Sequence, residues 1–232
     1  MTSAVRVVAV PGLGLSVPVA RRALDRLPDV DGTVVLLPGF GRRAPRRTPL
    51  APAQLARLLL ERLPTAGPTV LVGHSASCQI VAEVAVQAPH RVAALVLVGP
   101  TTDPRAATWP ALAGRWLRTA AHERPGQIPL LVRAYARTGL LSMARGMDAA
   151  RHHRLASTVA AVACPVLVVR GQHDAICPAD WTAVLAAGTD HGRAETLPAG
   201  AHMVPITHPD ALAARIAAFL DGMTAARTRP ST

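Results

Sequence analysis

The sequence contains no lysine, so all 25 of its basic residues are arginine; against 14 acidic residues they give a formal net charge of +11. Aromatic residues are also scarce, at 3% of the chain, and the arginines are spread along its length. A protein that binds nucleic acid is expected to gather positive charge on one face and to supply aromatic rings for base stacking. The composition therefore predicts no nucleic-acid partner, and a mutational bias toward arginine codons accounts for the charge.

Only three cysteines are present, Cys78, Cys164 and Cys177, and their spacing is not that of metal ligands. This odd number predicts neither a disulfide framework nor a structural zinc site, and it fits a reducing cytosol. The N-terminus shows no basic segment followed by an apolar stretch and a cleavage site, so we expect no secretory signal. We therefore expect a cytoplasmic protein without a bound metal.

Long apolar runs are missing as well. No run approaches the roughly 18–20 uncharged residues that a membrane-spanning helix needs, so we expect no membrane span. Half of the 232 residues are nevertheless apolar and only 17% are charged. This composition is too apolar for a disordered chain and suits one domain with a substantial buried core.

Short runs rich in valine and leucine recur along the chain, separated by segments with helical spacing of apolar residues. The runs are continuous rather than alternating, which is typical of strands buried on both faces of a parallel sheet. Predicted strands cover residues 5–10, 33–37, 69–72, 93–98, 165–169 and, more weakly, 194–197; predicted helices cover 17–27, 52–63, 75–88 and 209–223, before a polar end at 224–232. The alternation predicts an α/β fold with a mostly parallel, six-stranded sheet flanked by helices.

Residues 103–162 interrupt this alternation. They contain helical patterns punctuated by proline and glycine and no convincing strand, yet they lie between two strands of the same sheet. We therefore predict an α/β core formed by residues 1–102 and 163–232, with residues 103–162 as a helical lid, or cap, inserted into it.

The most informative segment is Gly73-His74-Ser75-Ala76-Ser77, which follows one predicted strand and leads directly into a helix. A serine at such a tight turn adopts strained backbone angles, and its neighbours two residues away must be small. The turn exposes the serine oxygen and places the next N–H at the positive end of a helix, where it can stabilise an oxyanion. The alternative is that Ser75 only caps the helix.

A nucleophilic serine needs a base, and the base needs an acid that orients it. Asp174 and His202 each follow a predicted strand, so both should lie at the same sheet edge as Ser75, where α/β sheets hold their active sites. The chain order Ser, Asp, His is the order expected of such an arrangement. Asp103, which follows the strand at 93–98, is an alternative acid, whereas His74 and His173 are expected to pack or to be solvated.

Together these segments resemble the α/β-hydrolase superfamily, in particular its lid-bearing serine hydrolases, over nearly the whole chain. Pro11-Gly12-Leu13-Gly14 occupies the place of the family's His-Gly oxyanion loop. The sequence departs from the family pattern at Pro11, Ser77 and Ala201. The resemblance implies that Ser75 is the nucleophile, His202 the general base and then acid, and Asp174 the orienting carboxylate. It also implies an oxyanion hole formed by the backbone N–H groups of Leu13 and Ala76.

Several side chains are candidates for contact with a substrate. Three of the six aromatic residues lie in the predicted lid, and one follows the second predicted strand; with the neighbour of His202, the candidates are Phe40, Trp109, Trp116, Tyr135 and Met203. An apolar pocket under a helical lid suits a hydrophobic acyl group. The arginine cluster at residues 42–47 could attract a carboxylate, a phosphopantetheine arm or an acidic carrier protein, although a solvated loop face is the simpler interpretation.

The sequence thus predicts a cofactor-independent serine hydrolase that cleaves a carboxylic ester, thioester or lactone of a hydrophobic small molecule through an acyl-enzyme. A serine at the turn disfavours dehalogenase and epoxide-hydrolase chemistry, which in similar proteins uses an aspartate there. Two alternatives stay open: the same triad could serve a C–C bond hydrolase or a biosynthetic acyltransferase or cyclase, or the fold could act as a small-molecule receptor or scaffold.

Overall fold

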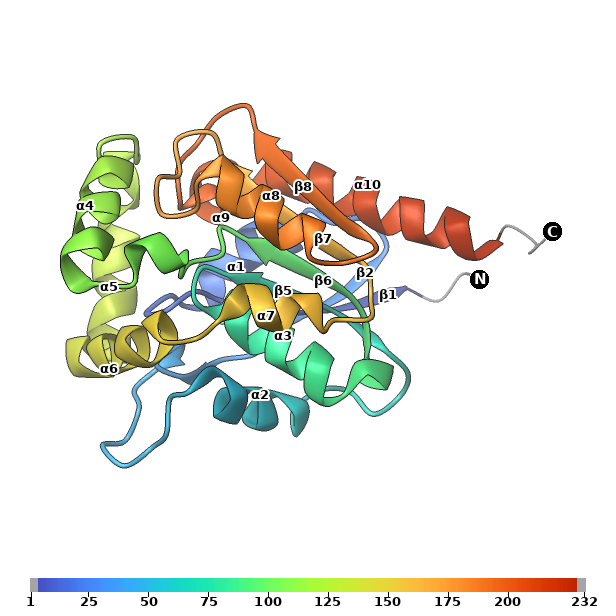
Figure 1. Cartoon of the computed structure of the whole chain (residues 1–232), viewed down its shortest axis with the longest axis horizontal. Helices are drawn as coiled ribbons and strands as arrows, with labels where there is room; N and C mark the ends of the chain where they lie inside the picture. Colours follow the sequence, from blue (N-terminus) through green and yellow to red (C-terminus); the bar gives the residue numbers. More distant parts are fainter. Residues whose placement is uncertain (1–3, 229–232) are drawn as a thin grey trace.

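A computed structural model describes residues 4–228 of the chain. Its centre is a parallel six-stranded sheet with helices on both faces (Figure 1). The strands are β1 (Val5–Val10), β2 (Val30–Val34), β5 (Thr69–His74), β6 (Val92–Val98), β7 (Val166–Gly171) and β8 (Gly192–Leu197), arranged in the order β2-β1-β5-β6-β7-β8. Every neighbouring pair is parallel, so the predicted sheet is present and is parallel throughout.

Two apolar layers hold the sheet between its helices. Along β6, Leu95 and Leu97 face one layer while Val96 and Val98 face the other. This strand is apolar without interruption because successive side chains point to opposite faces and both faces are covered. The first layer packs against α2 (Pro52–Leu60), α3 (Ser77–Gln87) and α8 (Ala179–Ala187), and the second against α1 (Val17–Leu24) and α10 (Pro209–Thr228).

The strand predicted at residues 33–37 is wrong in position. β2 covers Val30–Val34, and Leu37–Pro38 instead forms β3, which pairs with β4 (Gly41–Arg42) in a separate two-stranded sheet. β2 is an edge strand whose residues alternate between partly buried and exposed, so it lacks the continuous apolar run of a central strand. α10 also runs beyond the predicted end at residue 223, and residues 229–232 of the predicted polar end lie outside the described residues.

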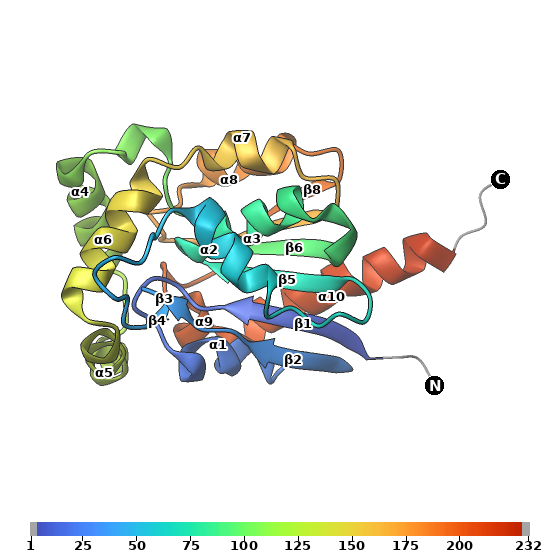
Figure 2. The same cartoon turned by 90° about the horizontal axis from the view of Figure 1, so that it is seen from below.

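The segment between β6 and β7 is helical, as predicted, and contains no strand within the described residues. Its helices are η2 (Pro104–Ala106), α4 (Trp109–Ala120), η3 (Pro125–Gln127), α5 (Ile128–Thr138), α6 (Leu140–Arg151) and α7 (Leu155–Ala160). Figures 1 and 2 show α4, α5 and α6 gathered at one end of the sheet, and we call these three helices the cap. α7 differs, because Leu155 and Val159 belong to the core layer that covers α3 and α8.

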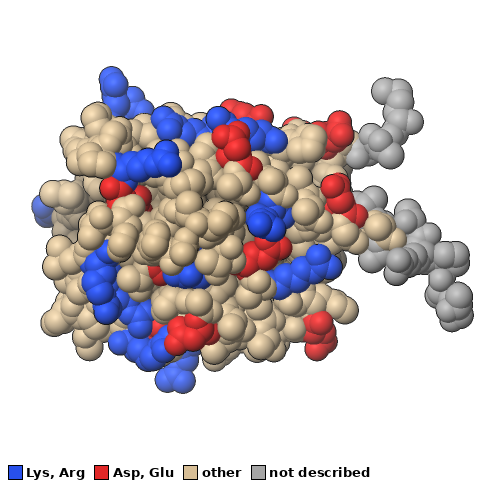
Figure 3. All heavy atoms as spheres, turned by 90° about the horizontal axis from the view of Figure 1, so that it is seen from above, with Lys and Arg blue, Asp and Glu red and all other residues tan. Residues whose placement is uncertain are grey.

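The described helices show no membrane-spanning candidate: none of them combines the length and apolar character that crossing a bilayer requires. Figure 3 shows one face of the surface, on which arginine and acidic side chains are scattered among each other rather than gathered into a single basic patch. The strands β1, β5, β6, β7 and β8 end toward the cap (Figure 2), so the loops that follow them meet beneath it.

Candidate active site

Ser75 occupies a strained turn between β5 and α3. Its φ of 59° lies in the left-handed region that few residues other than glycine adopt, and its N–H donates to Val98 O at 2.8 Å. A Cβ at Gly73 would lie 2.8 Å from the Cα of Cys78, so only glycine allows the strand and helix to approach this closely. The local packing therefore explains both the glycine before the serine and the strained angle.

Ser77 stands where the serine-turn pattern usually has glycine, and the structure gives its side chain a role. It is fully buried, accepts a hydrogen bond from His74 N at 2.8 Å, and lies 2.7 Å from Val10 O, to which its hydroxyl donates. The hydroxyl thus ties the turn to β1. This departure from the pattern therefore adds hydrogen bonds to the turn.

The structure brings Ser75, His202 and Asp174 into one hydrogen-bonded chain. His202 Nε2 lies 2.8 Å from Ser75 Oγ, and His202 Nδ1 lies 2.8 Å from Asp174 Oδ2. The other oxygen of Asp174 accepts backbone N–H groups from Ile176 and Cys177 at 2.9 and 3.0 Å. This network assigns the Nδ1–H tautomer to His202, which leaves Nε2 free to accept the serine proton.

All three side chains are removed from solvent, with 8% of Ser75, 4% of His202 and 1% of Asp174 exposed. Burial lowers the pKa of His202, but the charge of Asp174, the hydrogen bond to it and the charge of Glu123 together raise it by more, so the pKa of His202 lies above its ordinary value of 6.5. A histidine with this pKa accepts a proton more readily than a free imidazole does.

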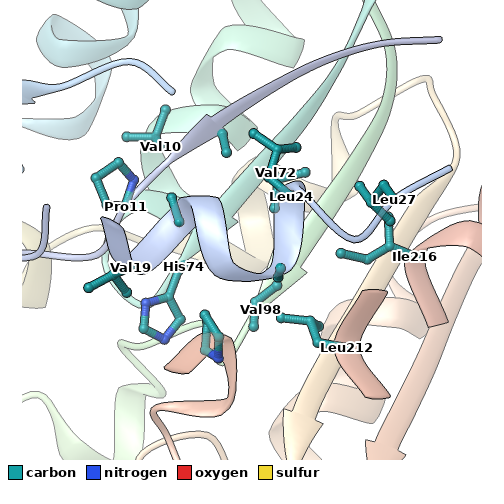
Figure 4. A pocket seen from close by; sticks show the side chains of 14 residues that line it. Val10, Pro11, Val19, Leu24, Leu27, Val72, His74, Val98, Leu212 and Ile216 are labelled. Atoms are coloured by element: carbon teal, nitrogen blue, oxygen red, sulfur yellow. The ribbon is translucent and has the colours of Figure 1, made fainter. Parts of the chain in front are cut away.

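His74, the residue before Ser75, packs beneath His202. Its Nε2 lies 3.0 Å from His202 O and the two rings are 5.2 Å apart. Burial, and next the nearby His202, lower the pKa of His74 to about 3, so it is neutral and its Nε2–H donates to that carbonyl. On its other side lies a small apolar cavity bordered by Val10, Pro11 and Val19 (Figure 4).

Of the two predicted oxyanion donors, Leu13 lines the same cavity as Ser75 and Ala76 directly follows it in the chain. The backbone N–H groups of Leu13, after β1, and Ala76, at the start of α3, have no acceptor among the described residues. A Cβ at Gly12 would lie 2.9 Å from His74 Nδ1, so the loop after β1 packs directly on the serine turn. Both N–H groups are therefore available to a bound oxygen.

A cavity of about 250 Å³ opens over Ser75 between the core and the cap. The residues that line it include three predicted substrate contacts, Trp116, Tyr135 and Met203; the full lining is Leu13, Leu15, His74, Ser75, Trp116, Tyr135, Met143, Ala144, Met147, His202 and Met203. A second cavity, also about 250 Å³, shares Trp116, His202 and Met203 and extends under α4 and α5. Both cavities thus border His202.

Two predicted substrate contacts lie elsewhere. Phe40 is only 2% exposed and packs in the core layer that includes Leu37. Trp109 is 48% exposed and its ring lies under the guanidinium of Arg151, at 5.4 Å. The structure places neither at the cavities over Ser75.

The cavity residues that sequence reasoning missed include Met143 and Met147 of α6. Their spacing of four residues puts both on one side of the helix, and this periodicity is the signal that could have identified them. Many other cap residues share this spacing but have exposed side chains, so the spacing alone does not identify the residues that line the cavity.

Asp103 is held by arginine side chains and is not near His202 in the hydrogen-bond network. Its carboxylate contacts Arg105 and Arg115, each at 2.7 Å, and Arg105 also pairs with Asp180. These contacts keep its pKa below the ordinary value although burial raises it. Of the other histidines, His173 stacks on His122 with ring centroids 4.5 Å apart.

Two of the three cysteines lie close to this chain of groups: Cys78 is three residues after Ser75, and the backbone N–H of Cys177 donates to Asp174 Oδ1. Cys78 and Cys177 are buried, and burial raises the pKa of both thiols, so they are protonated. Among the described residues, no group of three histidine, cysteine or acidic side chains is placed to hold a metal ion. The arginine cluster at 42–47 lies outside both cavities, and Arg145 of α6 donates to Pro45 O and Thr48 O beside it.

Comparison with known proteins gives a consistent picture. The model of the family described as "Alpha/beta hydrolase family" matches residues 7–215. A hydrolase from Oleispira antarctica has a similar structure, with a TM-score of 0.77 and 14% identity over 94% of this chain and 91% of that chain. An enol-lactonase from Burkholderia xenovorans has a TM-score of 0.73 and 18% identity over 94% and 92% of the two chains.

A thermophilic esterase from Thermogutta terrifontis is also similar, with a TM-score of 0.69 and 20% identity over 94% of this chain and 90% of that chain. At these identities the similarity concerns the fold. No curated protein sequence is significantly similar to this chain.

Proposed function

This chain belongs to the alpha/beta hydrolase family, and we propose that it is a serine hydrolase acting on a carboxylic ester, thioester or lactone of a hydrophobic small molecule. The observation that carries the proposal is the buried chain Ser75–His202–Asp174, with 2.8 Å at both hydrogen bonds. Family membership alone does not specify a reaction, because one fold hosts many functions.

In the proposed reaction, Ser75 Oγ attacks the carbonyl carbon of the substrate while His202 Nε2 takes its proton. Asp174 keeps the Nδ1–H tautomer in place and stabilises the imidazolium that forms. The protonated His202 then donates to the leaving oxygen or sulfur, which departs and leaves an acyl-enzyme on Ser75. Water, deprotonated by His202, releases the acid and restores the serine.

The N–H groups of Leu13 and Ala76 are the proposed oxyanion donors. Ala76 begins α3, so its N–H also lies at the positive end of a helix. One such donor is worth roughly 2.7–4 kcal/mol of the barrier. The unpaired state of both groups supports the assignment.

The character of the cavity supports a hydrophobic acyl group. Leu15, Met143 and Met147 line it with few polar side chains besides Ser75 and the two histidines. Methionine adapts to irregular apolar ligands. That similar folds include an enol-lactonase and an esterase is consistent with acyl chemistry, and the cap, which covers Ser75, is proposed to act as the lid of the site.

The first test treats the purified protein with a fluorophosphonate and measures its intact mass. We expect one adduct on the wild type and on Ser157→Ala, a matched change at an exposed serine of α7, and none on Ser75→Ala. His202→Ala should react far more slowly. A persistent adduct on Ser75→Ala, or no adduct on a folded wild type, would contradict the proposal and favour a receptor or scaffold.

The same proposal distinguishes the two candidate acids. Asp174→Asn should lower kcat for p-nitrophenyl butyrate by about 10⁴-fold, because the histidine loses its orienting carboxylate. Asp103→Asn should weaken the attachment of α4 and lower the melting temperature, yet leave kcat within about tenfold of the wild type, since Asp103 contacts arginines and not His202. The reverse order of effects would make Asp103 the acid.

A further inference from the structure

The end of α4 contacts both loops that carry the polar partners of Ser75. Thr119 Oγ1 accepts a hydrogen bond at 3.1 Å from the backbone N–H of Ala175, the residue after Asp174. Glu123 Oε1 accepts one at 2.8 Å from the backbone N–H of Met203, the residue after His202. Thr119 lies in the last turn of α4 and Glu123 in the turn just after it, so this stretch, residues 109–123, which we call the α4 segment, reaches both loops.

Both acceptors are held in place. Thr119 is only 1% exposed, and Glu123 Oε2 accepts a hydrogen bond at 2.8 Å from Gln127 Nε2 on the following turn. Gln127 is itself buried. Glu123 therefore presents a fixed carboxylate to the Met203 N–H, and a hydrogen bond to an ionised acceptor is stronger than one between neutral groups.

Two more contacts from this segment reach the same region. Arg115 pairs with the buried Asp103 at 2.7 Å, and His122 stacks on His173, the residue before Asp174. The α4 segment is thus fastened to the catalytic loops themselves rather than only to its neighbours in the cap. A displacement of α4 would remove the acceptors of Ala175 and Met203 together.

We propose that Thr119 and Glu123 are positioning residues, which hold the loops of Asp174 and His202 in register with Ser75 only while α4 is seated on them. The proposal rests on the proposed serine hydrolase function. It makes the closure of the cap a condition for an active triad: a substrate that holds the cap closed also completes the site, and an open cap leaves Ser75 weakly activated.

The negative charge of Glu123 acts on the pKa of His202, so the pH dependence of the reaction tests for an effect that a purely packing role of Glu123 would not have. Three titratable groups face His202: Asp174 and Glu123, which raise its pKa, and the neutral His74 beneath it. His202 acts as a base only when it is unprotonated, so kcat/KM rises as the pH passes its pKa. Removing the negative charge of Glu123 should lower that pKa and move the acid limb of the profile to lower pH.

The experiment measures the rate of fluorophosphonate labelling and the pH profile of p-nitrophenyl butyrate hydrolysis in matched variants. Glu123→Ala and Thr119→Val should each lower the labelling rate and kcat by about 10- to 100-fold with KM changed less, because small misplacements of catalytic groups are costly. Thr119→Ser, which keeps the acceptor, should restore most of the rate. Glu123→Gln should keep the fold and shift the acid limb.

Asp148→Asn is the control, since this exposed carboxylate of the cap pairs with Arg151 and touches neither catalytic loop. It should leave the rate and the pH profile unchanged. The inference would be overturned, with the proposed function left standing, if Glu123→Ala and Thr119→Val had wild-type rates and an unshifted acid limb and lowered only the melting temperature. Failure of the wild type itself to react at Ser75 would overturn the proposed function as well.

Discussion

His74 is the neighbour of the proposed nucleophile, and its buried imidazole has the backbone carbonyl of the proposed base as its partner. The folded protein holds it unprotonated, with a pKa of about 3 against 6.5 for the free side chain. Protonation of His74 near neutral pH is therefore unfavourable in the folded protein, whereas in the unfolded chain His74 is protonated at its ordinary pKa. This difference connects one residue to the acid stability of the whole site.

The sign of the effect follows from the depressed pKa. The contribution of His74 to the free energy of unfolding is complete above pH 6.5 and is lost as the pH falls toward 3, at about 1.4 kcal/mol per pH unit. Between pH 7 and pH 5 we expect urea denaturation to show a loss larger by about 2 kcal/mol in the wild type than in His74→Gln. The exposed His90→Gln should behave as wild type, and equal losses in all three proteins would contradict the prediction.

Single residues also show the limits of sequence reasoning. The order and context of Ser75, Asp174 and His202 predicted that they lie at one sheet edge, because each follows a parallel strand. Phe40 could not be assigned in the same way. The sequence around an aromatic residue in a loop near that edge has the same pattern whether the ring faces the cavity or, as it does here, the core.

α6 is the element that shapes the acyl end of the cavity. It supplies Met143 and Met147, one turn apart, and Gly146 of the same helix lies so near Leu13 that a Cβ there would come within 2.6 Å of its side chain. The helix therefore rests directly on the proposed oxyanion loop. A larger side chain on its inner face has no room to move away and must fill the cavity.

From this packing we expect Met147→Trp to shorten the acyl chains that the protein accepts. With p-nitrophenyl esters from acetate to decanoate, kcat/KM should fall by about 10-fold or more for the long chains and little for acetate, because one or two methylenes in an apolar pocket are worth 1–3 kcal/mol. Val132→Trp, an exposed change on α5, is the matched control. A uniform loss at every chain length would argue against this role of α6.

Elements differ in how well the sequence predicts them, and the reason is their place in the sheet. β5, β6 and β7 are covered on both faces, so their apolar runs gave positions close to those observed. β2 borders solvent, and the alternation in Val30-Asp31-Gly32-Thr33-Val34 is a weaker signal than the apolar run at residues 33–37, which predicts the strand too late in the chain. The contacts of Thr119 and Glu123 were beyond prediction, because neither residue follows a strand or belongs to a motif that places it, as the residues of the triad do.

At the scale of the whole molecule, the core and the cap differ in how they are stabilised. The sheet is buried between two apolar layers, whereas the cap exposes Leu117, Val132 and Leu140, each more than half accessible. Few buried apolar contacts and much exposed surface are the marks of regions that open locally at low free-energy cost.

We therefore expect hydrogen exchange to separate the two parts. Amides of β5, β6 and β7 should be the slowest to exchange and those of α4, α5 and α6 among the fastest, while α7, which is buried in the core, should follow the sheet. A covalent fluorophosphonate adduct on Ser75 should slow exchange in α4, as measured by mass spectrometry of peptides. Equal protection of cap and sheet would show that the cap does not open separately.

The position of α7 has a consequence for how this protein can change. β6 and β7 are adjacent and directly paired, from Leu95 opposite Val166 to Val98 opposite Val169, and α7 packs on the sheet as an ordinary crossover helix between them. The three cap helices are therefore an insertion into the connection from β6 to β7, for which α7 alone would serve as the crossover helix. Changes to α5 and α6 can therefore reshape the substrate cavity without touching the sheet, whereas a change to α4 also affects the hydrogen bonds that it makes to the loops of Asp174 and His202.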